Sequence, residues 1–183
     1  MRDRFKEWLL EIQENALAIK RAKALKAGDE SLWKKQKWLS PQKNSDIKAR
    51  FRDEGEKLGY RSLPSYKTGA GEWLYDFVWR KFDDEGHLEE IVLAMEIEMS
   101  DRTERGLMRD FAKLLQSDAA YKIMVFQHKT DDDIHTAFEH FKKRAAKYRV
   151  KVPSEFLLCG WSTSMNQFLF TEFSTSGRDL KPD

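Results

Sequence analysis

Two apolar segments joined by a turn constrain the fold of this 183-residue chain more than any other part of it. Residues 73–82 and 91–99 are rich in Val, Ile, Leu, Phe, Trp and Tyr, and the sequence DDEG, residues 83–86, lies between them. Apolar runs on either side of turn-forming residues predict a β-hairpin. Neither run alternates cleanly between apolar and polar residues, which is typical of strands covered on both faces. We therefore expect the hairpin to lie inside a sheet flanked by helices.

Three carboxylates, Asp76, Glu96 and Glu98, interrupt these strands where core residues are expected. Side chains two residues apart on a strand point to the same side, so Glu96 and Glu98 share a face. A three-residue loop, residues 85–87, would place Asp76 directly opposite Glu96, whereas a four-residue loop would turn Asp76 away. We take the three-residue loop, which brings the three carboxylates together. Such a buried cluster is strongly unfavourable, through desolvation and repulsion, unless protons or a cation compensate it.

A divalent metal is the simplest compensation for this cluster. Hard cations such as Mg²⁺ prefer carboxylate oxygens and retained water. A bound metal can lower the pKa of a water molecule and neutralise charge that develops on a phosphate. The sequence thus suggests Mg²⁺ or Mn²⁺ held by Asp76, Glu96 and Glu98, and the chemistry of phosphodiester hydrolysis.

An Asp on one strand, a turn, and Glu-x-Glu near the end of the next strand resemble the PD-(D/E)XK nuclease superfamily. Asp76 matches the family's aspartate and Glu96 its (D/E), whereas Glu98 stands where the family usually has Lys. Some restriction enzymes of the superfamily carry Glu-x-Glu there, but the change removes the ammonium that usually orients or activates the attacking water. The resemblance implies a restriction-endonuclease-like α/β fold and a metal-dependent endonuclease, with DNA a commoner substrate in the superfamily than RNA.

Two further residues are candidates for this site because of the resemblance. Lys113 lies in the helix predicted after the hairpin and could supply the cation that Glu98 does not. Glu54 lies on the helix before the first strand, where the superfamily often has an acidic residue that faces the metal. Each has a simpler alternative, which is a solvent-facing position for Lys113 and an ion pair with Lys57 or Arg50 for Glu54.

The order of the remaining elements also predicts an α/β fold with a mixed sheet. Helices are expected from residue 45 or 46 to 59, from 101 or 103 to 115, and over 134–148, and strands over 61–67, 121–126, 156–159 and 167–173. A strand, a helix and a further strand imply a right-handed crossover, so residues 121–126 should pair in parallel with the second hairpin strand. The superfamily core has this order of elements over about residues 46–127. We assign the domain to residues 46–177 and a tail to residues 178–183.

Residues 1–45 are interpreted as a basic amphipathic helix and a linker. Apolar residues recur at helical spacing from Phe5 to Leu25, which predicts one helix over residues 3–27. Its apolar stripe would pack on the domain or on a second copy of the chain in a two-fold homodimer. Residues 1–52 hold 14 Lys and Arg against 7 Asp and Glu, a net charge of +7, whereas the whole chain has +2. An arm that binds nucleic acid through lysines and tryptophans, a solvated helix face and a linker anchored on the core all explain this pattern.

Composition argues against several other classes of protein. Charged residues make up 35% of the chain, and no apolar run approaches the roughly 20 residues of a transmembrane helix. The single cysteine, Cys159, and an amino terminus with charges throughout predict a cytoplasmic protein without a signal peptide. No Walker loop, GxGxxG, GxSxG or CxxC motif is present, and the spacing of the histidines predicts no zinc site.

Two other functions remain open from the sequence. A catalytically inactive nuclease-fold protein could bind nucleic acid or act as an assembly module, which the loss of the usual Lys favours. Retention of three acids argues against it, because apolar replacements would stabilise a site without function. A hydrolase of sugars with two carboxylates would need one acid of raised pKa and a substrate cleft.

Overall fold

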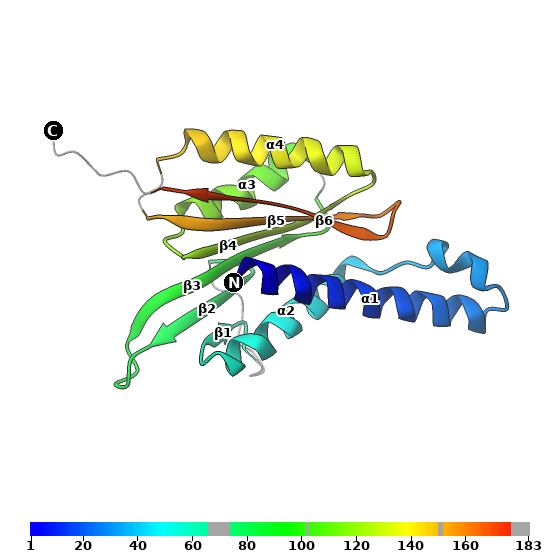
Figure 1. The fold of residues 1–183 in the computed structure, drawn as a ribbon, viewed down its shortest axis with the longest axis horizontal. Coiled ribbons are helices and arrows are strands. Elements are labelled where there is room, and N and C mark those ends of the chain that lie inside the picture. The colour runs from blue at the N-terminus through cyan, green and yellow to red at the C-terminus, as the bar shows by residue number, and fades with distance from the viewer. Residues whose placement is uncertain (66–73, 102, 150–151, 177–183) are drawn as a thin grey trace.

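The computed structural model describes residues 1–65, 74–101, 103–149 and 152–176. Six strands form one sheet in the order β1-β2-β3-β4-β5-β6, with helices on both of its faces (Figure 1). The β3–β4 and β4–β5 pairs are parallel and the other pairs are antiparallel. In chain order the elements are α1 (Arg2–Lys26), η1 (Glu30–Lys35), α2 (Ser40–Lys57), β1 (Arg61–Leu63), β2 (Phe77–Phe82), β3 (Leu88–Glu98), α3 (Glu104–Gln116), β4 (Tyr121–His128), α4 (Asp131–Lys147), β5 (Ser154–Ser162) and β6 (Gln167–Thr175).

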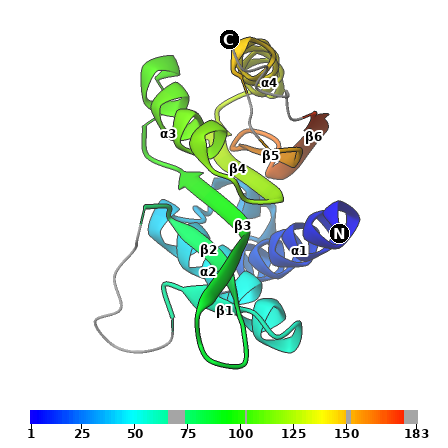
Figure 2. The same cartoon turned by 90° about the vertical axis from the view of Figure 1, so that its left-hand side faces the viewer.

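The sheet separates two hydrophobic clusters. α1 and α2 lie on one face, and α3 and α4 lie on the other (Figures 1 and 2). Met95 and Val125 belong to the first cluster, whereas their neighbours Ala94 and Phe126 belong to the second. Because both faces are covered, the central strands need apolar residues on both sides. The prediction of an α/β fold with a mixed sheet flanked by helices is confirmed.

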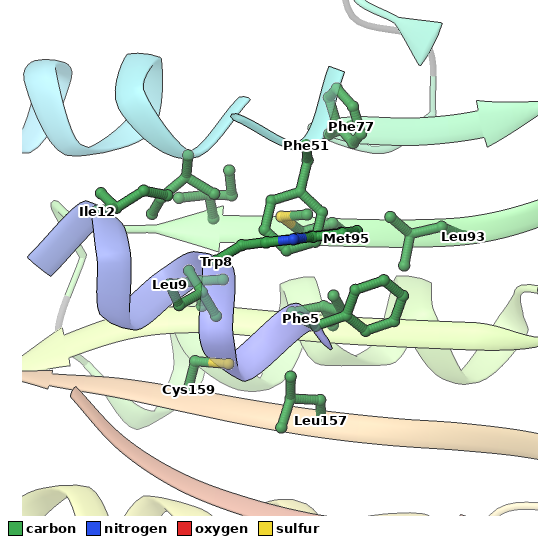
Figure 3. Close-up of a cluster of buried hydrophobic side chains, with 14 of the residues drawn as sticks. Phe5, Trp8, Leu9, Ile12, Phe51, Phe77, Leu93, Met95, Leu157 and Cys159 are labelled. Carbon is green, nitrogen blue, oxygen red and sulfur yellow. The ribbon is translucent and has the colours of Figure 1, made fainter. Parts of the chain in front are cut away.

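The amino-terminal half of α1 packs inside the first cluster. Phe5, Trp8, Leu9 and Ile12 point toward the sheet and toward Phe51 of α2 (Figure 3). The apolar stripe of α1 therefore finds a partner within the chain. Farther along, α1 continues beyond the sheet with η1 beside its end (Figure 1), and Ile19 is 56% exposed.

The hairpin has a longer loop than predicted but the predicted register at its inner end. Phe82 pairs with Leu88, so the loop is the five residues 83–87, held by the Asp83 carboxylate, which accepts from the backbone N–H of His87 at 2.8 Å. Two register shifts then place two extra residues on β3, and Phe77 pairs with Met95. The three-residue loop was wrong, yet the shifts restore the same pairing and bring Asp76 beside Glu96.

Other boundaries differ from the sequence predictions in specific ways. α2 begins at Ser40 rather than at residue 45 or 46, because Pro41 lies in its first turn, where a missing N–H costs nothing. The predicted strand over residues 61–67 is β1, which ends at Leu63. Residues 66–73, with the predicted start of the first hairpin strand, and the predicted tail lie outside the described residues. None of the described helices combines the length and apolar character needed to cross a bilayer.

α2 lies directly against β2 at Gly55. A Cβ atom at this position would lie 2.3 Å from Nε1 of Trp79. The Trp79 indole is fully buried and donates a hydrogen bond to the Phe51 carbonyl oxygen at 2.9 Å. Only glycine therefore allows the helix and the strand this spacing.

Candidate active site

A pocket of about 500 Å³ lies at the carboxyl end of β3. In open α/β sheets, ligands commonly bind outside the carboxyl ends of strands. The first turn of α2, the end of β3 and the middle of α3 form the walls. The lining residues are Ser40, Pro41, Asn44, Asp76, Glu96, Ile97, Glu98, Met99, Ser100, Arg109, Asp110 and Lys113. Of the five predicted site residues, four line this pocket.

Glu96 is the most deeply buried carboxylate of the pocket, with only 1% of the residue exposed. Its Oε2 accepts a hydrogen bond from Lys113 Nζ at 3.0 Å, whereas its buried Oε1 has no hydrogen-bond partner in the described parts of the chain. Burial first, and then the nearby Asp76 carboxylate, raise the pKa of Glu96 to about 8. The site therefore contains a carboxylate oxygen that the residues described here leave unsatisfied, which is costly without a bound proton, water or cation.

Asp76 lies next to Glu96 just before β2. Its Oδ2 accepts a hydrogen bond from the backbone N–H of Ile97 at 2.7 Å, which fixes the carboxylate against the end of β3. Asp76 is half-buried and lines the same pocket. The predicted approach of Asp76 to Glu96 is thus present.

Glu98 lines the pocket but is directed toward the chain that follows β3. Its Oε1 accepts hydrogen bonds from Ser100 N–H, Ser100 Oγ–H and Asp101 N–H, each at 2.7 Å. This carboxylate therefore stabilises the turn between β3 and α3. Within the described parts of the chain, no three His, Cys, Asp or Glu side chains form a ready-made metal-binding group. Asp76 and Glu96 lie close together.

Lys113 reaches the site from α3. Its Nζ lies 3.0 Å from Glu96 Oε2 and 3.0 Å from Asp110 Oδ1. Although burial lowers the pKa of Lys113, hydrogen bonds to Asp110 and Glu96 raise it overall, so the ammonium stays charged. Lys113 thus lies in the pocket and contacts Glu96, as predicted for a cation of the site. Burial and the Asp76 carboxylate outweigh the effect of this ammonium, so the pKa of Glu96 stays raised.

Asp110 is a site residue that sequence reasoning missed. It is buried, contacts Lys113 and lies 3.7 Å from Arg109 Nε. The sequence feature that could have identified Asp110 is its position inside the apolar stripe of α3, three residues after Leu107 and four before Leu114. A carboxylate in that stripe must be buried, and a buried carboxylate needs a cation.

Glu54 lies outside the pocket and forms the ion pairs that were the alternative to a place at the metal site. Its carboxylate contacts Lys57 Nζ at 2.8 Å, Arg50 at 3.6 Å and Arg4 at 3.9 Å. The hydrogen bond from Lys57 holds the pKa of Glu54 below its ordinary value. The reason is the direction of the α2 face that carries Glu54, which points toward α1 and not toward the end of β3.

The proton on Glu96 predicts a specific pH dependence of stability. The folded chain holds this proton up to about pH 8, whereas an unfolded glutamate releases it near pH 4.5. The free energy of unfolding therefore falls as the pH rises between these values, by at most about 5 kcal/mol. Urea unfolding in EDTA at pH 5, 6.5 and 8 should show a steeper loss for the natural chain than for Glu96→Gln. Parallel pH profiles for the two proteins would contradict the raised pKa.

Asp76 and Glu96 have the chemistry that a hard divalent cation requires. Glu96 Oε1 has no hydrogen-bond partner among the described residues, and burial together with the Asp76 carboxylate raises the pKa of Glu96. Mg²⁺ is commonly bound by one or two carboxylates, with water and substrate phosphates completing its coordination. The residues present therefore fit a metal of this class.

Comparisons of this chain with protein-family models, with curated proteins and with solved structures gave no match.

Proposed function

We propose that this chain is a metal-dependent nuclease with a restriction-endonuclease-like fold that hydrolyses phosphodiester bonds in DNA with Mg²⁺ or Mn²⁺. The observation that carries the proposal is the buried Glu96, beside Asp76 and Lys113 in one pocket, whose Oε1 finds no hydrogen-bond partner in the part of the chain that the structure describes. The order α2, β1, β2, β3, α3, β4 supports it, because it is the order of the superfamily core.

Asp76 and Glu96 would hold the metal, which when bound would supply a Lewis acid and a water of lowered pKa. Glu98 supports the site indirectly, because its hydrogen bonds to Ser100 and Asp101 fix the turn that forms one wall. The reaction is attack of water on phosphorus, which forms one P–O bond while the bond to the 3′ oxygen breaks. The leaving oxygen takes a proton.

Lys113 would take the role of the lysine that the superfamily motif places where this chain has Glu98. Its ammonium lies 3.0 Å from Glu96 Oε2 and so can orient a water or a phosphate oxygen beside that carboxylate. Asp110 holds Lys113 in this position from the same helix. The positive charge is thus supplied from α3 instead of from β3.

A non-catalytic nucleic-acid-binding or assembly module is the second candidate, favoured by Glu98 in place of Lys. The position of Lys113 weakens that argument, because the site regains an ammonium. A module without catalytic function would be more stable with apolar groups at positions 76 and 96. The retained carboxylates therefore favour the nuclease.

The proposal is tested by cleavage of supercoiled plasmid and labelled single-stranded DNA with Mn²⁺, and with EDTA in its place. We expect cleavage that requires the metal, and titration calorimetry with Mn²⁺ should show saturable heat. Asp76→Asn should remove both signals, whereas Asp84→Asn, an exposed aspartate of the hairpin loop, should keep them. Saturable heat without cleavage would contradict the proposed nuclease activity. The absence of both heat and cleavage would leave the binding module as the proposed function. Cleavage that persists in EDTA would instead indicate a reaction without metal.

A further inference from the structure

A second pocket, of about 400 Å³, lies next to the first and is lined by lysines. It is bounded by α1, η1, the first turn of α2 and the ends of β4 and β5. No Asp or Glu of the described residues lines it. The lysines that line it are Lys20, Lys34, Lys35, Lys37 and Lys43. We call it the lysine pocket.

Two of these lysines are buried, each with 3% of the residue exposed. Lys43 Nζ donates to Gln127 Oε1 at 2.7 Å and lies 5.5 Å from the centre of the Trp38 ring. Lys20 Nζ donates to Asn166 Oδ1. The amide oxygen of Asn166 orients the Lys20 ammonium but leaves its full positive charge in place.

Burial has a cost at Lys20 that the described residues do not offset. Desolvation lowers the pKa of Lys20, and no carboxylate among the described residues forms an ion pair with it. A buried ammonium without a counter-charge is unfavourable. An anion that enters the pocket from solvent would supply that charge and would meet Lys34, Lys35 and Lys37 at the exposed side.

The lysine pocket and the active-site pocket share a wall. Ser40, in the first turn of α2, lines both of them. Gln127 of the lysine pocket donates to Ser40 Oγ at 3.2 Å, and Ser40 donates to the carbonyl oxygen of Met99, which lines the active-site pocket, at 3.1 Å. Because the two pockets adjoin at Ser40, one extended polyanion can have one phosphate in the active-site pocket and its neighbours at the lysines.

We propose that the lysine pocket binds backbone phosphates of the DNA strand that is cleaved, next to the phosphate that is hydrolysed in the active-site pocket. The inference rests on the proposed function, since it assigns to that substrate a second binding site. A polymeric phosphate fits better than a small anion, because the exposed lysines of η1 and the linker extend the positive surface away from the buried pair.

The test is the affinity for a fluorescein-labelled 20-nucleotide single strand, measured by anisotropy in EDTA so that no cleavage occurs. The triple variant Lys34→Gln, Lys35→Gln, Lys37→Gln should bind at least about tenfold more weakly at 0.1 M salt. Its slope of log affinity against log salt should fall by about 2, because three phosphate contacts are lost. The matched control removes three exposed charges from α4, on the other face of the sheet, as Lys143→Gln, Arg144→Gln, Lys147→Gln. It should bind within about twofold of the natural chain.

The outcomes distinguish this inference from the proposed function. Equal affinities for all three proteins, with Mn²⁺-dependent cleavage intact, would overturn the lysine pocket and leave the nuclease standing. Weaker binding of the triple variant alone would support the pocket even if no cleavage were found, and the binding module would then be the function. Polyglutamate that competes as well as unlabelled DNA would overturn the assignment to phosphate, because charge alone would explain the binding.

Discussion

Replacing Glu96 with glutamine is expected to lower the rate of Mn²⁺-dependent cleavage by about 10³-fold. The amide keeps the size of the side chain and an oxygen for the hydrogen bond from Lys113, but it removes the negative charge from a carboxylate that would hold the metal. At neutral pH the metal-free site already holds Glu96 protonated, so the uncharged amide should leave the fold intact. The loss is then chemical and not structural.

The measurement is the initial rate of plasmid nicking at pH 7.5, with unfolding midpoints recorded for each protein. Glu90→Gln is the matched control, because Glu90 is an exposed glutamate of the same strand. It should nick at the rate of the natural chain. A Glu96→Gln protein that unfolds normally and nicks within tenfold of that rate would show that the carboxylate pair is not the catalytic site.

Replacing Gly55 with alanine is expected to lower the free energy of unfolding by about 3 kcal/mol. The same change at an exposed helix position would raise stability by about 1 kcal/mol, because alanine has the higher helix propensity. At Gly55 the added Cβ would lie 2.3 Å from Trp79 Nε1. Either α2 must move from the sheet or the indole must give up its hydrogen bond to Phe51. Urea unfolding measures the difference.

A double-mutant cycle separates this clash from a general weakening of α2. Trp79→Phe removes Nε1, the nearest of the indole atoms that the new Cβ would meet, so Gly55→Ala should cost at least about 1 kcal/mol less in that background. Glu56→Ala, at an exposed position of the same helix, should change stability little. If the two substitutions prove additive, the close approach of α2 to Trp79 is not what requires glycine.

Much of the fold could be predicted because buried positions produce regular patterns of apolar residues in the sequence. The two-sided apolar runs identified the central strands, and helical spacing identified α1, α3 and α4. The hairpin loop could not be counted correctly, because its length depends on Asp83 accepting backbone hydrogen bonds within the turn. The start of α2 was missed because Pro41 suggests a break as readily as a first turn.

The candidate site was predicted in part, for reasons that differ between residues. Asp76 and Glu96 could be paired because strand register is a counting argument, although two compensating shifts had to occur. The partner of Lys113 and the partners of Glu54 depend on the rotation of each helix about its axis. A single sequence does not determine that rotation when charged residues occur on several faces of the helix. The orientation of Glu98 could not be predicted, because its carboxylate accepts hydrogen bonds from Ser100 and Asp101, in the turn that follows the strand.

The contact between α1 and β6 has a consequence for how this chain is made. The backbone N–H of Phe168 in β6 donates to the Gln13 side chain of α1 at 2.7 Å, and Phe168 belongs to the same cluster as Phe5 and Trp8. During synthesis the amino-terminal helix emerges from the ribosome long before β6 does. The apolar side chains of α1 therefore stay partly exposed to solvent until β6 has been made. α1 is made before β6 but is fully covered only after it, so chains halted before β6 should bind chaperones more than the finished protein does.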